Sequence, residues 1–176
     1  MLGVDPGTLV TGFGVVARSG ETFRLLASGT VNNRSEHSLP LRLENIHDGL
    51  REVIRKFRPR EFAIESAFYG KNAQSALKLG HARGVCLLAA AQAGLPAAEY
   101  SPREVKKSIV GNGNASKEQV QFMIKALLRL HNTPMVLDAS DAIAVAMCHL
   151  HRILTPAPRH ADWSAYVAAH PERVRS

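Results

Sequence analysis

Three short apolar runs separated by turn signals occupy the first 31 residues, and this arrangement constrains the fold more than any other feature. Pro6-Gly7 and Ser19-Gly20 separate runs at residues 2–5, 13–17 and 22–31. Pro-Gly and Ser-Gly pairs mark turns, and such short breaks favour strands that pair as antiparallel hairpins. We therefore predict that the chain begins with the antiparallel part of a β-sheet.

Helical and strand-like patterns alternate in the rest of the chain. Apolar residues recur every three or four positions over residues 39–57, which predicts a helix that Pro59 ends. Short apolar runs predict strands at residues 62–65 and 97–100, and the first of these follows a helix as a parallel strand does. The alternation is typical of an α/β layer architecture.

Four further helices are predicted. The helix at residues 75–93 is rich in small residues, and Gly80 and Gly84 within it suggest close packing because glycine weakens a helix. This helix could pack under the sheet or form a dimer contact, and the sequence does not separate the two. Ser101-Pro102-Arg103-Glu104 and Ser116 to Gln119 have the capping-box pattern of a helix start. A last helix at residues 138–150 is apolar nearly all round and should be buried.

The pattern of elements predicts one domain over residues 1–154 and a flexible tail over residues 155–176. The tail is set apart by prolines and by several Arg and His residues. Two cysteines, Cys86 and Cys148, lie in apolar helical runs without metal-ligand spacing, so we expect buried free thiols in a reducing cytoplasm. The most apolar window, residues 87–95, is too short to span a membrane.

The formal net charge is +7, which favours an anionic partner. Nucleic acid is the first candidate and an anionic membrane surface the second. A basic net charge can also do no more than keep a protein soluble, so charge by itself does not decide among these interpretations.

Four acidic residues are candidates for a metal site. Asp5 and Glu65 end predicted strands, and ligands of open α/β sheets bind outside the carboxyl ends of strands. Asp138 and Asp141 are three residues apart, so a helix places them on one face. Mg²⁺ is held by carboxylates together with substrate phosphate, and two such ions activate water for phosphate-ester cleavage.

Each of these acids also has an ordinary structural explanation. Asp5-Pro6-Gly7 is a common turn sequence, Asp138 suits a helix N-cap, and Asp141 favours the helix dipole. Glu65 would then face solvent at a strand end. Spacing alone leaves both interpretations open.

Blocks of sequence in a fixed order over residues 1 to about 152 carry a family resemblance. They are Gly3-Val4-Asp5-Pro6-Gly7-Thr8 with Thr11-Gly12-Phe13-Gly14-Val15, Phe62-Ala63-Ile64-Glu65 with Lys71-Asn72 and residues 75–80, Ala82-Arg83-Gly84-Val85, Val105-Lys106 with Gly111, Gly113 and Lys117, and Asp138-Ala139-Ser140-Asp141-Ala142. Together these blocks resemble the RuvC family of Holliday junction resolvases.

The resemblance implies a ribonuclease-H-like fold, in which helices flank a mixed five-stranded sheet. It implies a metal-dependent endodeoxyribonuclease that resolves four-way DNA junctions by paired symmetric nicks in homologous recombination and DNA repair. The four acids would hold the metal, with two Mg²⁺ ions per active site and Mn²⁺ able to substitute. The implied partners are a second copy of the chain in a homodimer, which suits a two-fold junction, and a branch-migration helicase complex.

Candidate DNA contacts lie near these acids in the sequence. Basic residues flank the Gly111-Asn112-Gly113-Asn114 loop, and they are Arg103, Lys106, Lys107 and Lys117. They fit either a solvated helix face or a phosphate clamp, and the resemblance implies DNA contact at Lys106 and Lys117. Phe68 and Tyr69 follow Glu65 and are either core residues or aromatic rings that stack on junction bases, a role the resemblance places at Phe68.

Three other functions compete with this interpretation. Asp5-Pro6-Gly7-Thr8 also fits an actin-like or sugar-kinase-like ATPase, but that class needs two lobes and further glycine-rich loops that this sequence does not show. A junction-binding protein without catalysis is the second alternative. The third is a nuclease for RNA–DNA hybrids or single strands, because fold does not fix substrate.

Overall fold

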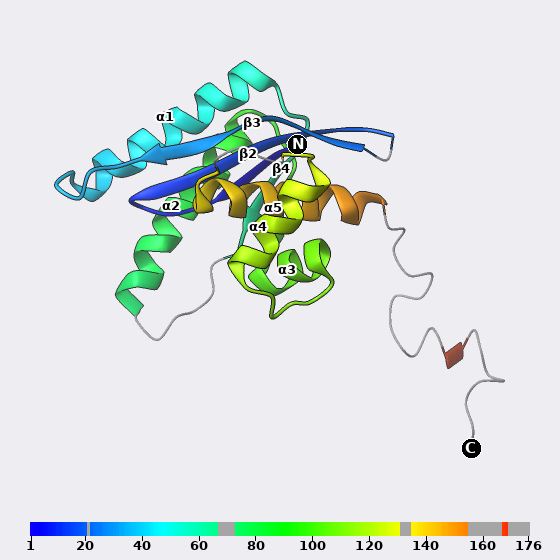
Figure 1. The fold of residues 1–176 in the computed structure, drawn as a ribbon. Coiled ribbons are helices and arrows are strands. Elements are labelled where there is room, and N and C mark those ends of the chain that lie inside the picture. Colours follow the sequence, from blue (N-terminus) through cyan, green and yellow to red (C-terminus); the bar gives the residue numbers. More distant parts are fainter. Residues whose placement is uncertain (21, 67–72, 131–134, 155–166, 169–176) are drawn as a thin grey trace.

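A five-stranded mixed sheet forms the centre of the protein, as seen in a computed structural model that describes residues 1–20, 22–66, 73–130, 135–154 and 167–168 (Figure 1). The strand order is β3-β2-β1-β4-β5. The strands are β1 (Leu2–Asp5), β2 (Val10–Ser19), β3 (Thr22–Asn32), β4 (Phe62–Glu65) and β5 (Ala97–Tyr100). The first three pair antiparallel, whereas β4 pairs parallel with both β1 and β5. The predicted α/β class and mixed sheet are confirmed.

Helices α1 (Leu39–Phe57) and α2 (Ala73–Gln92) cover one face of the sheet. Helix α1 begins after Ser38 and ends at Arg58, whose left-handed backbone lets its N–H donate to the Ile54 carbonyl at 2.9 Å. The core on this face combines alternate strand residues with apolar helix residues, and its largest members are Leu2, Val4, Ile46, Leu50, Phe62 and Ile64.

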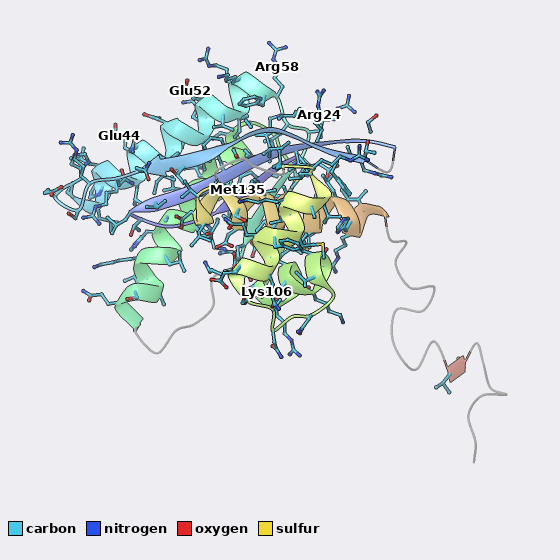
Figure 2. All side chains as sticks on the ribbon, viewed as in Figure 1. Arg24, Glu44, Glu52, Arg58, Lys106 and Met135 are labelled. Carbon is cyan, nitrogen blue, oxygen red and sulfur yellow. The ribbon has the colours of Figure 1, made fainter. Side chains whose placement is uncertain are left out.

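Helices α3 (Pro102–Val110), α4 (Lys117–Leu127) and α5 (Leu137–Leu154) cover the opposite face. Both predicted capping boxes are present, with Ser101 paired to Glu104 and Ser116 paired to Gln119. Lys106 on α3 and Glu44 and Glu52 on α1 therefore lie on opposite sides of the sheet (Figure 2). None of the helices in the described residues is long and apolar enough to cross a membrane.

Helix α5 lies directly on β1 and β2. A Cβ atom added to Gly3, Gly12 or Gly14 would come within 2.8 Å of an atom of α5, so only glycine permits this approach. The middle of α5, including Ile143 and Met147, is fully buried, as predicted for a helix that is apolar nearly all round.

The structure narrows one expectation about the helices and corrects another. Gly80 and Gly84 on α2 do not pack under the sheet, because a Cβ added at either would meet no atom within 4 Å in the described part of the chain, and only the alternative of a contact outside this chain is left for them. Helix α5 begins at Leu137, so Asp138 lies within the first turn and is not the N-cap residue. Apart from residues 167–168, the predicted tail over residues 155–176 lies outside the described residues.

Candidate active site

Asp5 and Glu65 end neighbouring parallel strands at the same edge of the sheet. In the pairing of β1 with β4, Val4 lies opposite Ile64, so the two acids are the next residues on their strands. Val4 and Ile64 belong to the core under α1 and α2. Because side chains alternate along a strand, Asp5 and Glu65 point to the other face, where α5 lies.

The first turns of α5 place Asp138 and Asp141 at the same edge. Asp5 pairs with Gly12 in the antiparallel ladder, and paired residues share a face of the sheet. A Cβ atom built on Gly12 would lie 2.1 Å from the Asp138 carbonyl oxygen, so α5 starts directly over this pair. The structure thus places all four predicted acids in one region.

The charges of these groups influence one another. The pKa of Asp5 is raised from 3.8 to about 7, first by burial and then by the negative charges of Glu65, Asp141 and, more weakly, Asp138, while the charge of Lys117 lowers it. Burial followed by the charge of Asp141 likewise raises the pKa of Glu65 from 4.5 to about 7. Both carboxyl groups are therefore partly protonated at neutral pH. Ionising both of them costs free energy, because they are buried and repel one another, unless a cation balances their charge.

A cleft of about 180 Å³ opens beside these carboxylates. Its charged lining consists of Asp5, Glu65, Asp141, Lys106 and Lys117. The Lys117 Nζ lies 2.5 Å from the Asp141 Oδ2, and this contact raises the pKa of Lys117. Among the described residues no three His, Cys, Asp or Glu side chains converge as a ready-made metal cage. The donor chemistry still fits a hard divalent cation, because buried carboxylates that repel one another are the oxygen ligands Mg²⁺ prefers.

The four predicted basic contacts do not lie together. Lys106 and Lys117 line the cleft with the acids. Lys107 lines a different cavity, with Tyr100, Cys148 and other residues at the far side of α3. Arg103 is exposed, and its side chain packs against Gly113 of the following loop. Phe68 and Tyr69 lie outside the described residues.

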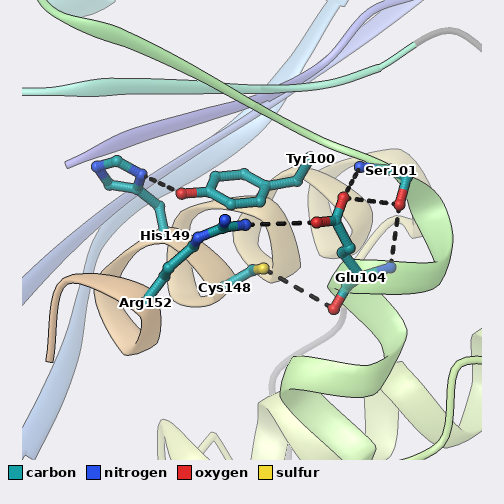
Figure 3. A network of polar contacts seen from close by, with 6 residues as sticks. All are labelled: Tyr100, Ser101, Glu104, Cys148, His149 and Arg152. Carbon is teal, nitrogen blue, oxygen red and sulfur yellow. Dashed lines mark hydrogen bonds and ion pairs between the residues drawn. The ribbon is translucent and has the colours of Figure 1, made fainter. Parts of the chain in front are cut away.

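A polar network links the end of β5 and the start of α3 to α5 (Figure 3). The Tyr100 hydroxyl lies 2.7 Å from the His149 Nδ1, and the His149 Nε2 lies 2.5 Å from the Glu61 carboxylate. Arg152 pairs with Glu104, which also caps α3 through Ser101. The sequence did not indicate this network, because residues 61, 100–104 and 149–152 are far apart along the chain.

Two further residues at the site edge received no individual role from the sequence. The hydroxyl of the buried Thr11 donates to the Gly7 carbonyl at 2.7 Å and so closes the turn that follows Asp5. Gly12 is the cross-strand partner of Asp5 and lies against the main-chain carbonyl of Asp138. Glycine within a strand is a known sign of close backbone approach, and this sign could have identified Gly12.

Comparisons with known proteins agree on one family. A family model described as crossover junction endodeoxyribonuclease RuvC matches residues 1–149. The protein of that name from Shewanella sp. (strain MR-4) is 52% identical over 151 residues, which is 86% of each chain. Its counterpart from Chloroherpeton thalassium is 42% identical and covers 98% of this chain and 97% of its own.

Solved structures give the same result. Thermus thermophilus RuvC in complex with a Holliday junction substrate superposes with a TM-score of 0.81 at 36% identity, covering 86% of this chain and 93% of that one. The yeast mitochondrial Holliday junction resolvase Ydc2 superposes with a TM-score of 0.60 at 14% identity, covering 84% of this chain and 75% of that one. At that identity the second match shows a shared fold alone.

Proposed function

The chain belongs to the RuvC family of crossover junction endodeoxyribonucleases, and from this premise we propose that Asp5, Glu65, Asp138 and Asp141 hold the metal ions of its active site. The protein is a metal-dependent endonuclease that resolves four-way DNA junctions in recombination and repair. The observation that supports the assignment of the acids is that they share one edge of the sheet. Two strand ends and the start of one helix bring them to this edge, and Asp5, Glu65 and Asp141 line the cleft beside it.

Two Mg²⁺ ions are the proposed cofactor, with Mn²⁺ able to substitute. When bound, such ions activate the attacking water and stabilise the leaving oxygen of the phosphate ester. Asp5 and Glu65 must release their protons to act as ligands, so metal affinity rises with pH through about 7. Displacement of the 3′ oxygen would leave 5′-phosphate ends.

Lys106 and Lys117 are the proposed contacts to the phosphate at the cut site. Both ammonium groups lie at the cleft, and both lower the pKa of Glu65. Arg103 and Lys107 lie farther from the acids, so we assign them to phosphates of the junction arms. Phe68 and Tyr69 follow Glu65 closely in sequence, and stacking on junction bases remains the proposed role for them, with Phe68 first.

We propose that the exposed face of α2 forms a homodimer contact. Leu77 and Leu88 are 64% and 50% exposed, and they lie with Gly80 and Gly84 on the side of α2 opposite its buried residues Ala82 and Cys86. Glycines that meet nothing within the described chain allow a second helix to approach closely. A dimer would present two equal sites to a two-fold junction.

A cytoplasmic location and a branch-migration helicase complex as a partner complete the proposal. The location is supported by two buried free thiols, Cys86 and Cys148, which fit a reducing compartment. The helicase complex is proposed from family membership alone.

Titration calorimetry with MnCl₂ tests the metal assignment without relying on catalysis. The wild type should bind Mn²⁺ at pH 8, and Asp5→Asn should lose at least about tenfold in affinity because a buried charged ligand is removed. Glu44→Gln, an exposed site on the other side of the sheet, serves as the matched control and should bind as the wild type does. Equal Mn²⁺ affinity in all three proteins would contradict the assignment.

A further inference from the structure

Gly12 lies at the point where the strand that carries Asp5 meets the helix that carries Asp138 and Asp141. It pairs with Asp5 across the β1–β2 ladder, and its missing side chain would point to the same face as the Asp5 carboxyl group. The backbone of α5 fills that space. A Cβ at Gly12 would lie 2.1 Å from the carbonyl oxygen of Asp138, 2.6 Å from its carbonyl carbon and 3.3 Å from the Ala139 nitrogen.

The atoms that Gly12 meets belong to the main chain, so no side-chain rotation relieves the overlap. Real Cβ atoms essentially never lie closer than 3.0 Å to such an atom, so any side chain at position 12 forces β2 and the first turn of α5 about 1 Å farther apart. Asp138 sits in that turn and Asp141 one turn later. The displacement therefore increases the distance from Asp5 to Asp138 and Asp141.

We propose that Gly12 is a positioning residue that sets the spacing of the metal-binding carboxylates, and thereby the preference of the site for a small cation. The inference rests on the proposed metal site. Mg²⁺ requires ligand oxygens at about 2.0–2.1 Å in near-octahedral geometry, whereas Ca²⁺ accepts distances of about 2.3–2.6 Å and irregular geometry. A site widened by about 1 Å loses Mg²⁺ more than Ca²⁺.

Gly14 provides the matched control. It lies on the same strand and the same face, against the same helix, two residues from Gly12. An added Cβ there would meet the Ile143 Cγ1 at 2.6 Å, but the nearest main-chain atoms of α5, the Cα and N of Ile143, lie at 3.0 Å and not at 2.1 Å as at Gly12. Gly14→Ala therefore adds the same methyl group to the same interface with a smaller shift of the acids.

The experiment compares Mg²⁺ and Ca²⁺ binding by titration calorimetry in full-length wild type, Gly12→Ala, Gly14→Ala and Asp5→Asn. All samples contain trimethylamine N-oxide, which favours the folded state, and thermal unfolding without metal records the stability of each. We expect both alanine variants to unfold at lower temperature. Gly12→Ala should lose at least about tenfold in Mg²⁺ affinity and about threefold or less in Ca²⁺ affinity, while Gly14→Ala keeps the wild-type ratio.

Each other outcome overturns the inference. Equal Mg²⁺-to-Ca²⁺ ratios in Gly12→Ala and Gly14→Ala would show that the spacing does not depend on Gly12. Loss of a cooperative unfolding transition in Gly12→Ala would make Gly12 a requirement for folding and not a positioning residue. Equal Mg²⁺ affinity in the wild type and Asp5→Asn would refute the proposed metal site itself. This comparison separates failure of the metal site from failure of the proposed role of Gly12.

Discussion

The ammonium nitrogen of Lys117 lies 2.5 Å from a carboxylate oxygen of Asp141, although 24 positions separate the two residues. Lys117 is the first residue of α4 and Asp141 lies near the start of α5, so the contact joins two helices across the cleft. A group proposed to contact DNA is thus paired with a group proposed to hold metal. Binding of a junction phosphate and binding of a cation therefore affect the same ion pair.

Removing the Lys117 charge should raise the pKa of both strand-end acids. Lys117 lowers the pKa of Asp5 and of Glu65, so in Lys117→Met, without metal, both pKa values should increase. Carboxyl ¹³C NMR titration measures this directly. Lys107→Met is the control, because Lys107 lines a different cavity, and it should leave both pKa values unchanged. Unchanged values in Lys117→Met would refute the pairing.

Asp5 should destabilise the metal-free protein at neutral and higher pH. Its carboxyl group has a pKa of about 7 when folded and 3.8 ordinarily, so the folded protein binds more protons than the unfolded chain between about pH 4 and 7. Folded stability from this group is therefore lost as the pH rises through that window. Asp5→Asn should raise the free energy of unfolding by about 1–3 kcal/mol at pH 8 and change it little at pH 4.

Urea unfolding in EDTA at the two pH values checks this prediction. Glu44→Gln, which is exposed on α1, should show no such pH dependence. A gain in Asp5→Asn that is equal at both pH values would show that the effect is one of packing and not of charge.

Lys106 and Lys107 are neighbours in sequence but should act differently. Lys106 lies in the cleft with Glu65, so Lys106→Ala should lower the rate of the cleavage step at saturating junction by about tenfold or more. Lys107 lies at the far side of α3, so Lys107→Ala should leave that rate near the wild-type value. Single-turnover cleavage of a labelled junction measures this rate in both variants. A larger loss of rate in Lys107→Ala would reverse the assignment.

A charged residue introduced on the exposed face of α2 should weaken the proposed dimer. Leu88→Glu places a carboxylate at a side chain that is 50% exposed, so the monomer should fold normally while association weakens by at least about tenfold. Sedimentation equilibrium measures the association. Phe122→Glu changes a 73% exposed apolar residue on α4 and should leave association unchanged, and a dimer that survives Leu88→Glu would place the contact elsewhere.

The main elements and the strand-end acids were predictable because local patterns specify them. Capping boxes at Ser101 and Ser116 marked helix starts, and apolar runs that end in Asp5 and Glu65 marked strands whose parallel pairing brings the acids together. The same reasoning from local pattern could not decide whether Gly80 and Gly84 face the sheet or a second copy of the chain, because the face of a helix that a glycine occupies depends on tertiary packing.

The contacts that complete the site could not be predicted in this way. The pairing of Lys117 with Asp141 and the approach of Gly12 to Asp138 join elements that are far apart in the chain. The difference between Lys106 and Lys107 depends on how α3 is rotated against α5. Such relationships follow from the packed fold and leave no short-range pattern in the sequence.

Cleavage of a labelled synthetic four-way junction by wild type and Asp5→Asn, with Mg²⁺ or Mn²⁺, tests the central claim most directly. We predict paired symmetric nicks with 5′-phosphate ends from the wild type, and loss of cleavage in Asp5→Asn while junction binding persists. If the wild type binds the junction tightly but cuts it with neither metal, or if Asp5→Asn cuts as fast as the wild type, the metal-binding role of the four carboxylates is contradicted.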